Sequence, residues 1–265
     1  MLLHVHEWGD PSAPPLVCLH GVTAHGRRFR KLAEERWASR FRVLAPDLRG
    51  HGRSGYEPPW DIETHVGDLV ATVVEHAGVA RAIWLGHSFG GRLVVELAAR
   101  TPELIERSVL LDPALELLPH VAFDFAEEVR KDVSFETPDE AVEVRLAAGA
   151  TSRREFLEEE MREHLIPAPD GKLRFQYCRS AVVTAYSEMA TAPPAPDTLR
   201  FPTLLVYAEQ FGLVRPEQVE AYRTTLDERL TLVAVSGGHT VYWDAYEQTA
   251  DAIDAFLLAG TQDLI

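Results

Sequence analysis

The sequence predicts an α/β fold in which a mostly parallel sheet is flanked by helices and carries one helical insertion. Three observations predict it: short apolar runs recur along the chain, helical patterns separate most of them, and a long central stretch lacks this alternation. The chain has 265 residues, 46% hydrophobic and 25% charged, a composition typical of packed globular proteins.

Six apolar runs have the length of a buried strand and are bounded by turn residues. They cover residues 16–19, 41–45, 82–85, 108–111, 203–207 and 230–235. Runs without polar alternation are typical of strands that are buried on both faces, as in parallel sheets.

Helices are expected between these runs. The apolar residues of 62–74 fall on one helical face, with Asp61 placed to cap the start and Gly78 the end. A second helix is expected over residues 90–100 and a last one over residues 244–258.

The alternation stops between Pro113 and about Arg200. This stretch has helical patterns and many charges but no convincing pair of strands, so it predicts a helical insertion. The expected organisation is a core of residues 1–113 and 200–265 with a helical cap over residues 114–199.

The charge balance excludes several classes of partner. With 26 basic and 41 acidic side chains the net charge is −15, and so acidic a surface repels phosphate backbones and anionic lipid headgroups. The N-terminus lacks the pattern of a signal peptide, and no window approaches 18 uninterrupted apolar residues. Cys18 and Cys178 are too few for a disulfide framework. We therefore expect a cytoplasmic protein without nucleic-acid or membrane partners.

A candidate nucleophile follows the third apolar run. Residues 82–85 lead into Gly-His-Ser-Phe-Gly-Gly at 86–91 and then into a predicted helix. A G-x-S-x-G sequence between a strand and a helix is typical of a serine nucleophile in a sharp turn, where glycines let strand and helix approach. The alternative is a tight packing turn, but this context favours Ser88 as a nucleophile.

A serine hydroxyl needs a base and an oxyanion site. Among eleven histidines His239 stands out, because it follows two glycines after the last predicted strand, at the same sheet end as Ser88. The oxyanion donors expected are the N–H of Phe89, directly after the nucleophile, and that of Val22, after the first run.

The remaining histidines have simpler explanations. His4 and His6 alternate on an expected edge strand and lack a third metal ligand at suitable spacing, so no metal site is predicted. His20, His51 and His87 lie in turns, where histidines organise backbone hydrogen bonds.

Taken in order, these segments resemble the α/β-hydrolase fold family. They are His-Gly at 20–21, Asp-Leu-Arg-Gly-His-Gly-Arg-Ser at 47–54, the turn at 86–91, and Gly-His at 238–239. In that family the 47–54 loop is structural, so the resemblance gives Asp47, Arg49 and Ser54 no catalytic role. It also implies that residues 114–199 form the family's cap.

The resemblance implies acyl transfer. Family members that cleave carbon–halogen bonds or epoxides carry an aspartate where this chain has Ser88, so those reactions are disfavoured. We expect hydrolysis of a small carboxylic ester or lactone through an acyl-enzyme, with no metal or organic cofactor. A C–C bond hydrolase, an aminopeptidase and a non-catalytic small-ligand binder are the alternatives.

Aromatic side chains are the candidates for an apolar substrate pocket. They are Phe123, Phe125 and Tyr186 in the expected cap and Phe211 in the core.

The acid that orients His239 departs from the family pattern. Family members have Gly-x-x-Asp-x-x-Val where residues 208–214 read Ala-Glu-Gln-Phe-Gly-Leu-Val, so Phe211 replaces the acid. A phenyl ring cannot accept a hydrogen bond from imidazole Nδ1–H. Asp112, after an earlier strand, and Glu209 are the candidates. We favour Asp112, because a subset of the family takes its acid from that strand end, although such an Asp also serves as a turn or cap residue.

Overall fold

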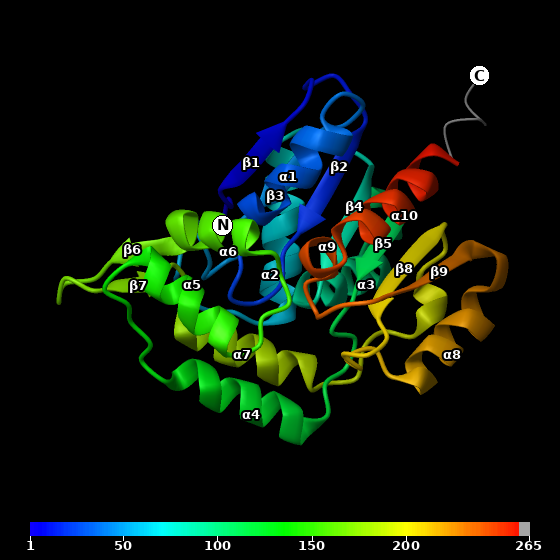
Figure 1. The fold of residues 1–265 in the computed structure, drawn as a ribbon. Coiled ribbons are helices and arrows are strands. Elements are labelled where there is room, and N and C mark those ends of the chain that lie inside the picture. Colours follow the sequence, from blue (N-terminus) through cyan, green and yellow to red (C-terminus); the bar gives the residue numbers. More distant parts are fainter. Residues whose placement is uncertain (260–265) are drawn as a thin grey trace.

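The computed structural model describes residues 1–259, which form a seven-stranded sheet with helices on both faces (Figure 1). The strands are β1 (Val5–Trp8), β2 (Pro15–Leu19), β3 (Arg42–Pro46), β4 (Ala82–His87), β5 (Ile105–Leu111), β8 (Thr203–Ala208) and β9 (Leu230–Val235). Their order in the sheet is β1-β3-β2-β4-β5-β8-β9, with β1 antiparallel to β3 and the other pairs parallel. The predicted fold class is confirmed. Residues 260–265 of the predicted core lie outside the described residues.

Successive residues of each strand point to opposite faces, and each face has its own apolar layer. Val17 and Leu19 pack with helices α2, α3 and α8 on one face, whereas Leu16 and Cys18 pack with α1, α9 and α10 on the other. These helices are α1 (Arg30–Leu32), extended by a π-helix (Ala33–Trp37); α2 (Ile62–Leu69), extended by a π-helix (Val70–His76); α3 (Phe89–Arg100); α8 (Pro216–Leu226); α9 (Val241–Asp244); and α10 (Tyr246–Leu258). Short 3₁₀ turns occupy Gly26–Phe29, Pro102–Leu104, Pro196–Thr198 and Asp227–Arg229.

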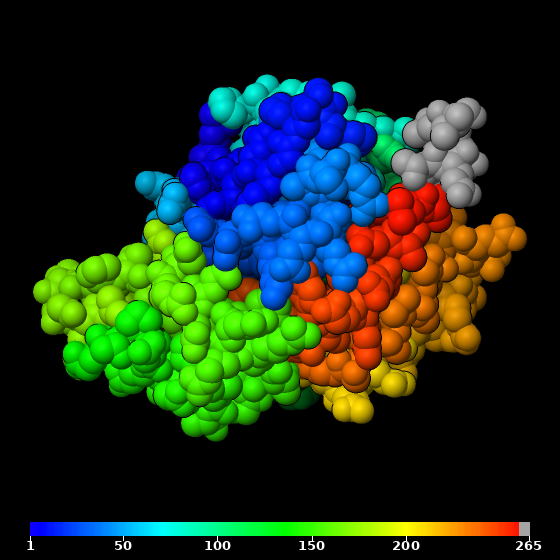
Figure 2. Space-filling view, turned by 45° about the horizontal axis from the view of Figure 1, so that its top comes forward, coloured from blue at the N-terminus to red at the C-terminus, as the bar shows by residue number. Residues whose placement is uncertain are grey.

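Residues 114–199, called the insertion below, leave the sheet after β5 and return before β8. Its elements are α4 (Pro119–Arg130), α5 (Pro138–Ala147), α6 (Arg154–His164), β6 (Leu165–Pro167), β7 (Leu173–Phe175) and α7 (Arg179–Met189). Part of it has a separate apolar cluster that includes Phe135, Leu157 and Met161. In Figure 2 its green surface adjoins both the blue N-terminal part and the orange-red C-terminal part of the chain.

The expectation that this stretch lacks a pair of strands was wrong. β6 and β7 pair antiparallel, from Leu165 opposite Phe175 to Pro167 opposite Leu173. Three residues a strand are too few for an alternating pattern to show in the sequence, so the turn at Pro169, Asp170 and Gly171, where the φ of Gly171 is +83°, does not by itself indicate a hairpin.

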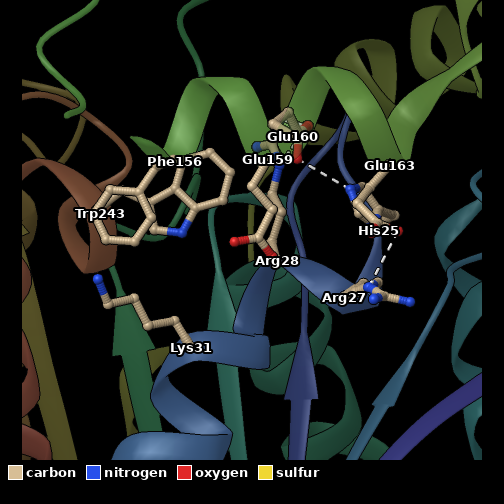
Figure 3. A pocket seen from close by; sticks show the side chains of 9 residues that line it. All are labelled: His25, Arg27, Arg28, Lys31, Phe156, Glu159, Glu160, Glu163 and Trp243. Carbon is tan, nitrogen blue, oxygen red and sulfur yellow. Dashed lines mark hydrogen bonds and ion pairs between the residues drawn. The ribbon is translucent and has the colours of Figure 1, made fainter. Parts of the chain in front are cut away.

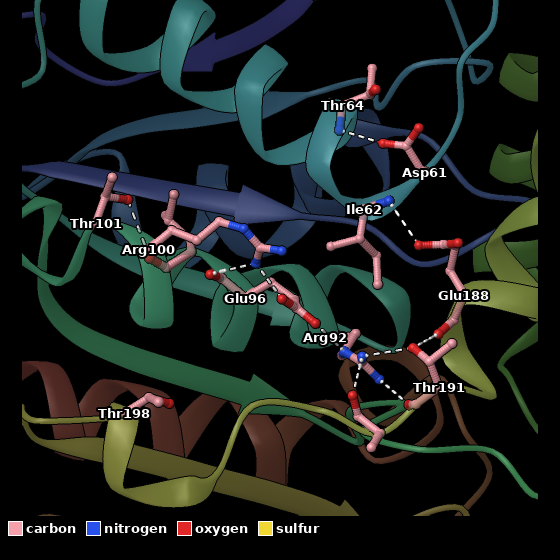
Figure 4. Close-up of polar contacts among 12 residues, drawn as sticks. Asp61, Ile62, Thr64, Arg92, Glu96, Arg100, Thr101, Glu188, Thr191 and Thr198 are labelled. Carbon is pink, nitrogen blue, oxygen red and sulfur yellow. Dashed lines mark hydrogen bonds and ion pairs between the residues drawn. The ribbon is translucent and has the colours of Figure 1, made fainter.

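A buried arginine ties both ends of the insertion to helix α3. The guanidinium of Arg92, 1% exposed, donates to the carbonyl of Leu115, where the insertion begins, and to those of Thr191 and Ala192, near its end (Figure 4). The same guanidinium pairs with Glu96 one turn along. One side chain of the core therefore holds both connections.

Within residues 1–259, no helix has both the length and the apolar composition that crossing a bilayer requires.

Candidate active site

Ser88 lies in the sharp turn that joins β4 to α3. Its φ is +54° and its ψ −118°, a strained conformation for a residue with a side chain. The neighbouring glycines explain how the turn closes, because a Cβ on Gly86 would overlap the carbonyl of Gly90, and one on Gly90 would overlap the carbonyl of Leu19. The serine side chain is thus held where strand and helix meet, with 5% of the residue exposed.

Asp112 and His239 are hydrogen-bonded to each other. Asp112 directly follows β5, is fully buried, and its Oδ2 lies 2.7 Å from His239 Nδ1. Its other oxygen accepts from the N–H of Ala208 at the end of β8, at 3.1 Å. The neighbouring strand thereby fixes the carboxylate that the histidine contacts.

The other acid candidate does not take part in this contact. Glu209 is exposed, and within residues 1–259 it makes no hydrogen bond to His239. The ring of Phe211 stacks on the imidazole of His239, with centroids 5.2 Å apart and an angle of 13° between the planes. The residue in place of the usual acid thus covers one face of the histidine.

Ser88 follows β4 and His239 follows β9, so both lie at the same edge of the sheet. Among the described residues no hydrogen bond joins Ser88 Oγ to His239. Such bonds are often long in ligand-free sites and tighten when substrate binds.

A second histidine positions the His239 loop. His87 Nε2 donates to the main-chain carbonyl of His239 at 2.9 Å, and the two rings lie 4.6 Å apart. Burial, followed by the nearby His239, lowers the pKa of His87 well below its usual value, so His87 is neutral. Sequence reasoning gave His87 only a turn role, because its partner is 152 residues away and no local pattern marks the contact.

The loop after β2 lies against the nucleophile. A Cβ on Gly21 would come within 2.8 Å of the Ser88 Cβ, so only glycine fits at that position. His20 holds the loop, because its Nδ1 donates to the Gly21 carbonyl at 2.7 Å and its Nε2 accepts from the N–H of Leu48 at 2.9 Å. Val22 follows directly.

Phe89 is the first residue of α3. Its N–H therefore has no acceptor inside the helix and remains available at the turn.

A cavity of about 320 Å³ lies between the insertion and the core. On the core side it is lined by Thr23, next to Val22, and by Thr240, next to His239. Phe125 of α4 and Tyr186 of α7 line it from the insertion and stack 5.5 Å apart.

Two of the aromatic residues predicted for the pocket do not line this cavity. Phe123 is 64% exposed, because residues two apart on a helix point in different directions and Phe125 takes the inward position. Phe211 packs on His239 instead.

Helix α6 of the insertion is fixed to the core by a buried carboxylate (Figure 3). Glu160, 3% exposed, accepts from Arg28 Nε at 2.8 Å and lies 3.0 Å from His25 Nε2. Burial raises the pKa of Glu160, but the charge of Arg28 and then that of His25 outweigh it, so the pKa lies well below its usual value. A second contact, from Ser152 to Asp244 at 2.5 Å, joins the insertion to the segment after His239.

The structure also supplies a third group beside His4 and His6. One ring nitrogen of each histidine and one carboxylate oxygen of Asp47 all lie within 4.8 Å of one another. The sequence spacing does not reveal it, because the antiparallel pairing of β1 with β3 creates it. The oxygens of Asp47 already accept from the N–H groups of Gly26 and Arg53, which gives this carboxylate a structural role.

The family model described as alpha/beta hydrolase fold matches residues 14–246. The chain belongs to the α/β-hydrolase fold family. Lipase LipV of Mycobacterium tuberculosis is 34% identical over 189 residues, which cover 71% of each chain. The sn-1-specific diacylglycerol lipase ABHD11 of Mus musculus is 24% identical over 259 residues, 94% of this chain and 82% of that one. The crystal structure of E-2-(acetamidomethylene)succinate hydrolase superposes with a TM-score of 0.85 at 25% identity, covering 96% of this chain and 94% of that one.

Membership of the α/β-hydrolase fold family explains why residues from distant segments converge. Parallel strands present their carboxyl ends at one edge of the sheet, so the residues after β2, β4, β5 and β9 gather there. In this chain those residues are Val22, Ser88, Asp112 and His239.

Proposed function

We propose that the chain hydrolyses carboxylic esters or lactones through an acyl-enzyme intermediate. The observation that carries this proposal is the 2.7 Å hydrogen bond between Asp112 and His239, at the edge of the sheet where Ser88 occupies a positive-φ turn. Ester chemistry is supported by the relatives whose names identify them as lipases.

The first half of the reaction acylates Ser88. With Nδ1–H bonded to Asp112, His239 has Nε2 free to take the hydroxyl proton as Ser88 Oγ attacks the substrate carbonyl. The N–H groups of Val22 and Phe89 stabilise the tetrahedral oxyanion. The protonated His239 then gives its proton to the leaving alcohol, and the C–O bond breaks.

The second half regenerates the enzyme. His239 takes a proton from a water molecule, the hydroxide attacks the acyl carbonyl, and Ser88 leaves with the proton that His239 returns. The product is the carboxylic acid. Asp112 stays ionised throughout and stabilises the imidazolium.

The insertion acts as the cap in this proposal. It supplies most of the cavity wall, including Phe125 and Tyr186, while the core supplies the reacting groups. Selectivity is thus assigned to the insertion and chemistry to the sheet edge. A cytoplasmic location also belongs to this proposal, and the free thiols of Cys18 and Cys178 are compatible with it.

Labelling by a fluorophosphonate probe tests the nucleophile directly. We expect stoichiometric labelling of the wild-type protein at neutral pH, none for Ser88→Ala, and unchanged labelling for Ser236→Ala, which removes an exposed serine near the His239 loop. A protein that stays unlabelled, or a Ser88→Ala variant that is labelled, would refute the mechanism. Aryl esters of increasing chain length, lactones and vinylogous diketones then separate ester from C–C bond hydrolysis.

A further inference from the structure

One cation on the wall of the cavity beneath the insertion forms no ion pair with another described residue. Five charged side chains line the cavity: Arg28, Glu128, Lys131, Arg145 and Glu160. Arg28 pairs with Glu160, and Lys131 pairs with Glu128. Within residues 1–259, the guanidinium of Arg145 forms neither a hydrogen bond nor an ion pair.

The local sequence explains why Arg145 has no partner. On a helix, a side chain pairs with residues three or four positions away. Around Arg145 in α5 these are small or apolar residues: Ala141, Val142, Ala148 and Gly149. The nearby acid on the same helix, Glu143, pairs instead with Arg154 of α6 at 2.8 Å. In a chain with a net charge of −15, an arginine that faces a cavity without an acidic partner is unusual.

Arg145 lines the cavity beside Tyr177 and Phe175, and it is also exposed to solvent. Desolvation and then the charge of Arg28 lower the pKa of Arg145, whereas the charges of Glu160 and Asp244 raise it, and a guanidinium stays protonated at neutral pH. An anion in this cavity would lie beside a cation.

The rest of the wall suits an apolar acyl chain. Most of its side chains are aromatic or aliphatic, among them Phe125, Phe135, Leu157, Met161 and Trp243. The same cavity reaches Thr23 and Thr240, the neighbours of the oxyanion loop and of His239. One molecule can therefore place a carbonyl at the sheet edge, an apolar chain along the wall and a charged end beside Arg145.

We propose that the substrate is an acyl compound with a second, carboxylate group, such as the monoester of a dicarboxylic acid, and that Arg145 binds this carboxylate. The two oxygens of a carboxylate match the planar fork of one guanidinium. A phosphate would carry more charge than this single unpaired cation can balance. This inference rests on the proposed function, because it names the substrate of the same site.

Matched esters test the charge preference. The mono-4-nitrophenyl esters of dicarboxylic acids, from adipic acid upward, are compared with uncharged 4-nitrophenyl esters of the same chain length. We expect the wild type to have the higher kcat/KM for the anionic series. Arg145→Gln should lower the ratio of anionic to neutral kcat/KM by about three- to tenfold, as loss of a charged contact at a solvent-exposed guanidinium implies. Arg145→Lys keeps the positive charge but lacks the planar guanidinium. Its ratio of anionic to neutral kcat/KM should lie between those of the wild type and Arg145→Gln.

Arg154→Gln is the matched control. It also removes one positive charge from the insertion, but Arg154 is exposed, pairs with Glu143 and does not line the cavity. Its ratio should equal that of the wild type. Because both rates in a ratio come from one preparation, partial unfolding of a variant does not alter the comparison. A wild type that prefers neutral esters, or an equal ratio in Arg145→Gln, would overturn the inference.

A binding experiment separates this inference from the proposed function. Calorimetry of Ser88→Ala with adipate should detect binding that the Ser88→Ala, Arg145→Gln double variant loses. Binding that depends on Arg145 in a protein without esterase activity would refute the hydrolase and keep the carboxylate site. Esterase activity without a difference between the two ester series, together with no adipate binding, would keep the hydrolase and refute the carboxylate site.

Discussion

Asp112 receives hydrogen bonds from two directions, one from His239 and one from the main chain of Ala208. Asp112→Asn keeps an oxygen for Ala208 but offers His239 an amide, which favours the wrong imidazole tautomer. We expect folding to be preserved and kcat to fall by up to ~10⁴. Steady-state hydrolysis of an aryl ester measures the loss.

Glu209→Gln is the control for this substitution, because Glu209 is close in sequence and exposed. Its kcat should match that of the wild type. A large loss in Glu209→Gln together with an active Asp112→Asn would transfer the acid role to Glu209, and full activity in both would leave a Ser-His dyad.

A substitution at Gly21 tests whether the loop after β2 lies directly against Ser88. The added Cβ of Gly21→Ala would meet the Ser88 Cβ at 2.8 Å, so the loop or the nucleophile must shift. We expect kcat to fall at least tenfold and fluorophosphonate labelling to slow, since small displacements of reacting groups are costly. Gly67→Ala, where a Cβ would meet nothing within 4 Å in the middle of α2, should leave activity intact and stabilise the helix by up to about 1 kcal/mol. Equal rates in the two variants would contradict a close approach of the loop to Ser88.

Among the elements, helix α3 has two roles, both near its N-terminal end. It starts at the nucleophile turn, and Arg92 in its first turn holds both connections of the insertion. Arg92→Met leaves buried carbonyls and one oxygen of Glu96 without their donor, so we expect the free energy of unfolding to fall by about 3–5 kcal/mol. Urea denaturation measures the change.

Arg100→Gln on the same helix provides the comparison. Arg100 is 42% exposed and contacts the other oxygen of Glu96, so its loss should cost no more than about 1 kcal/mol. Similar losses in the two variants would mean that the buried connections add nothing to stability.

The strands and the nucleophile turn were predictable because they depend on local patterns. Apolar runs of strand length mark the sheet, and the glycines at 86, 90 and 91 mark the turn around Ser88. The choice between Asp112 and Glu209 was not settled by sequence, because β5 and β8 are neighbours whose ends reach the same loop. Only their relative positions in space distinguish the two acids.

The insertion was harder to predict for a different reason. Its helices present charged residues on more than one side, so the sequence does not show whether Phe123 or Phe125 points inward. Pairing between distant segments is also invisible locally, as the contact of Asp47 with His6 across β1 and β3 demonstrates.

The whole molecule contains several neutral histidines that lower its stability in acid. Burial lowers the pKa of His51 to about 4 and those of His65 and His164 to about 3. Because these folded-state values lie below the unfolded value of about 6.5, the unfolded chain binds more protons as the pH falls. Stability is complete above about pH 6.5 and is lost progressively toward pH 4 and 3.

We expect the free energy of unfolding to decrease on the order of 1–2 kcal/mol per buried histidine between pH 6.5 and pH 5. The pKa values of the Asp47 and Glu160 carboxyls are also lowered in the folded protein. These two groups add to the loss of stability only when the pH falls below their unfolded pKa values near 4. Urea titrations at several pH values measure the slope of the free energy of unfolding against pH. His65→Leu should reduce this slope by an amount that corresponds to about one bound proton. A stability that rises between pH 6.5 and pH 5 would contradict these buried neutral states.

The position of the acid has a consequence for how such a protein can diverge. Because Asp112 bonds to His239 from the end of β5, the segment after β8 does not have to supply that carboxylate. The side chain of Phe211 in that segment stacks on His239, a contact that other flat or apolar side chains can make. Substitutions at position 211 can therefore accumulate while the hydrogen bond between Asp112 and His239 is kept.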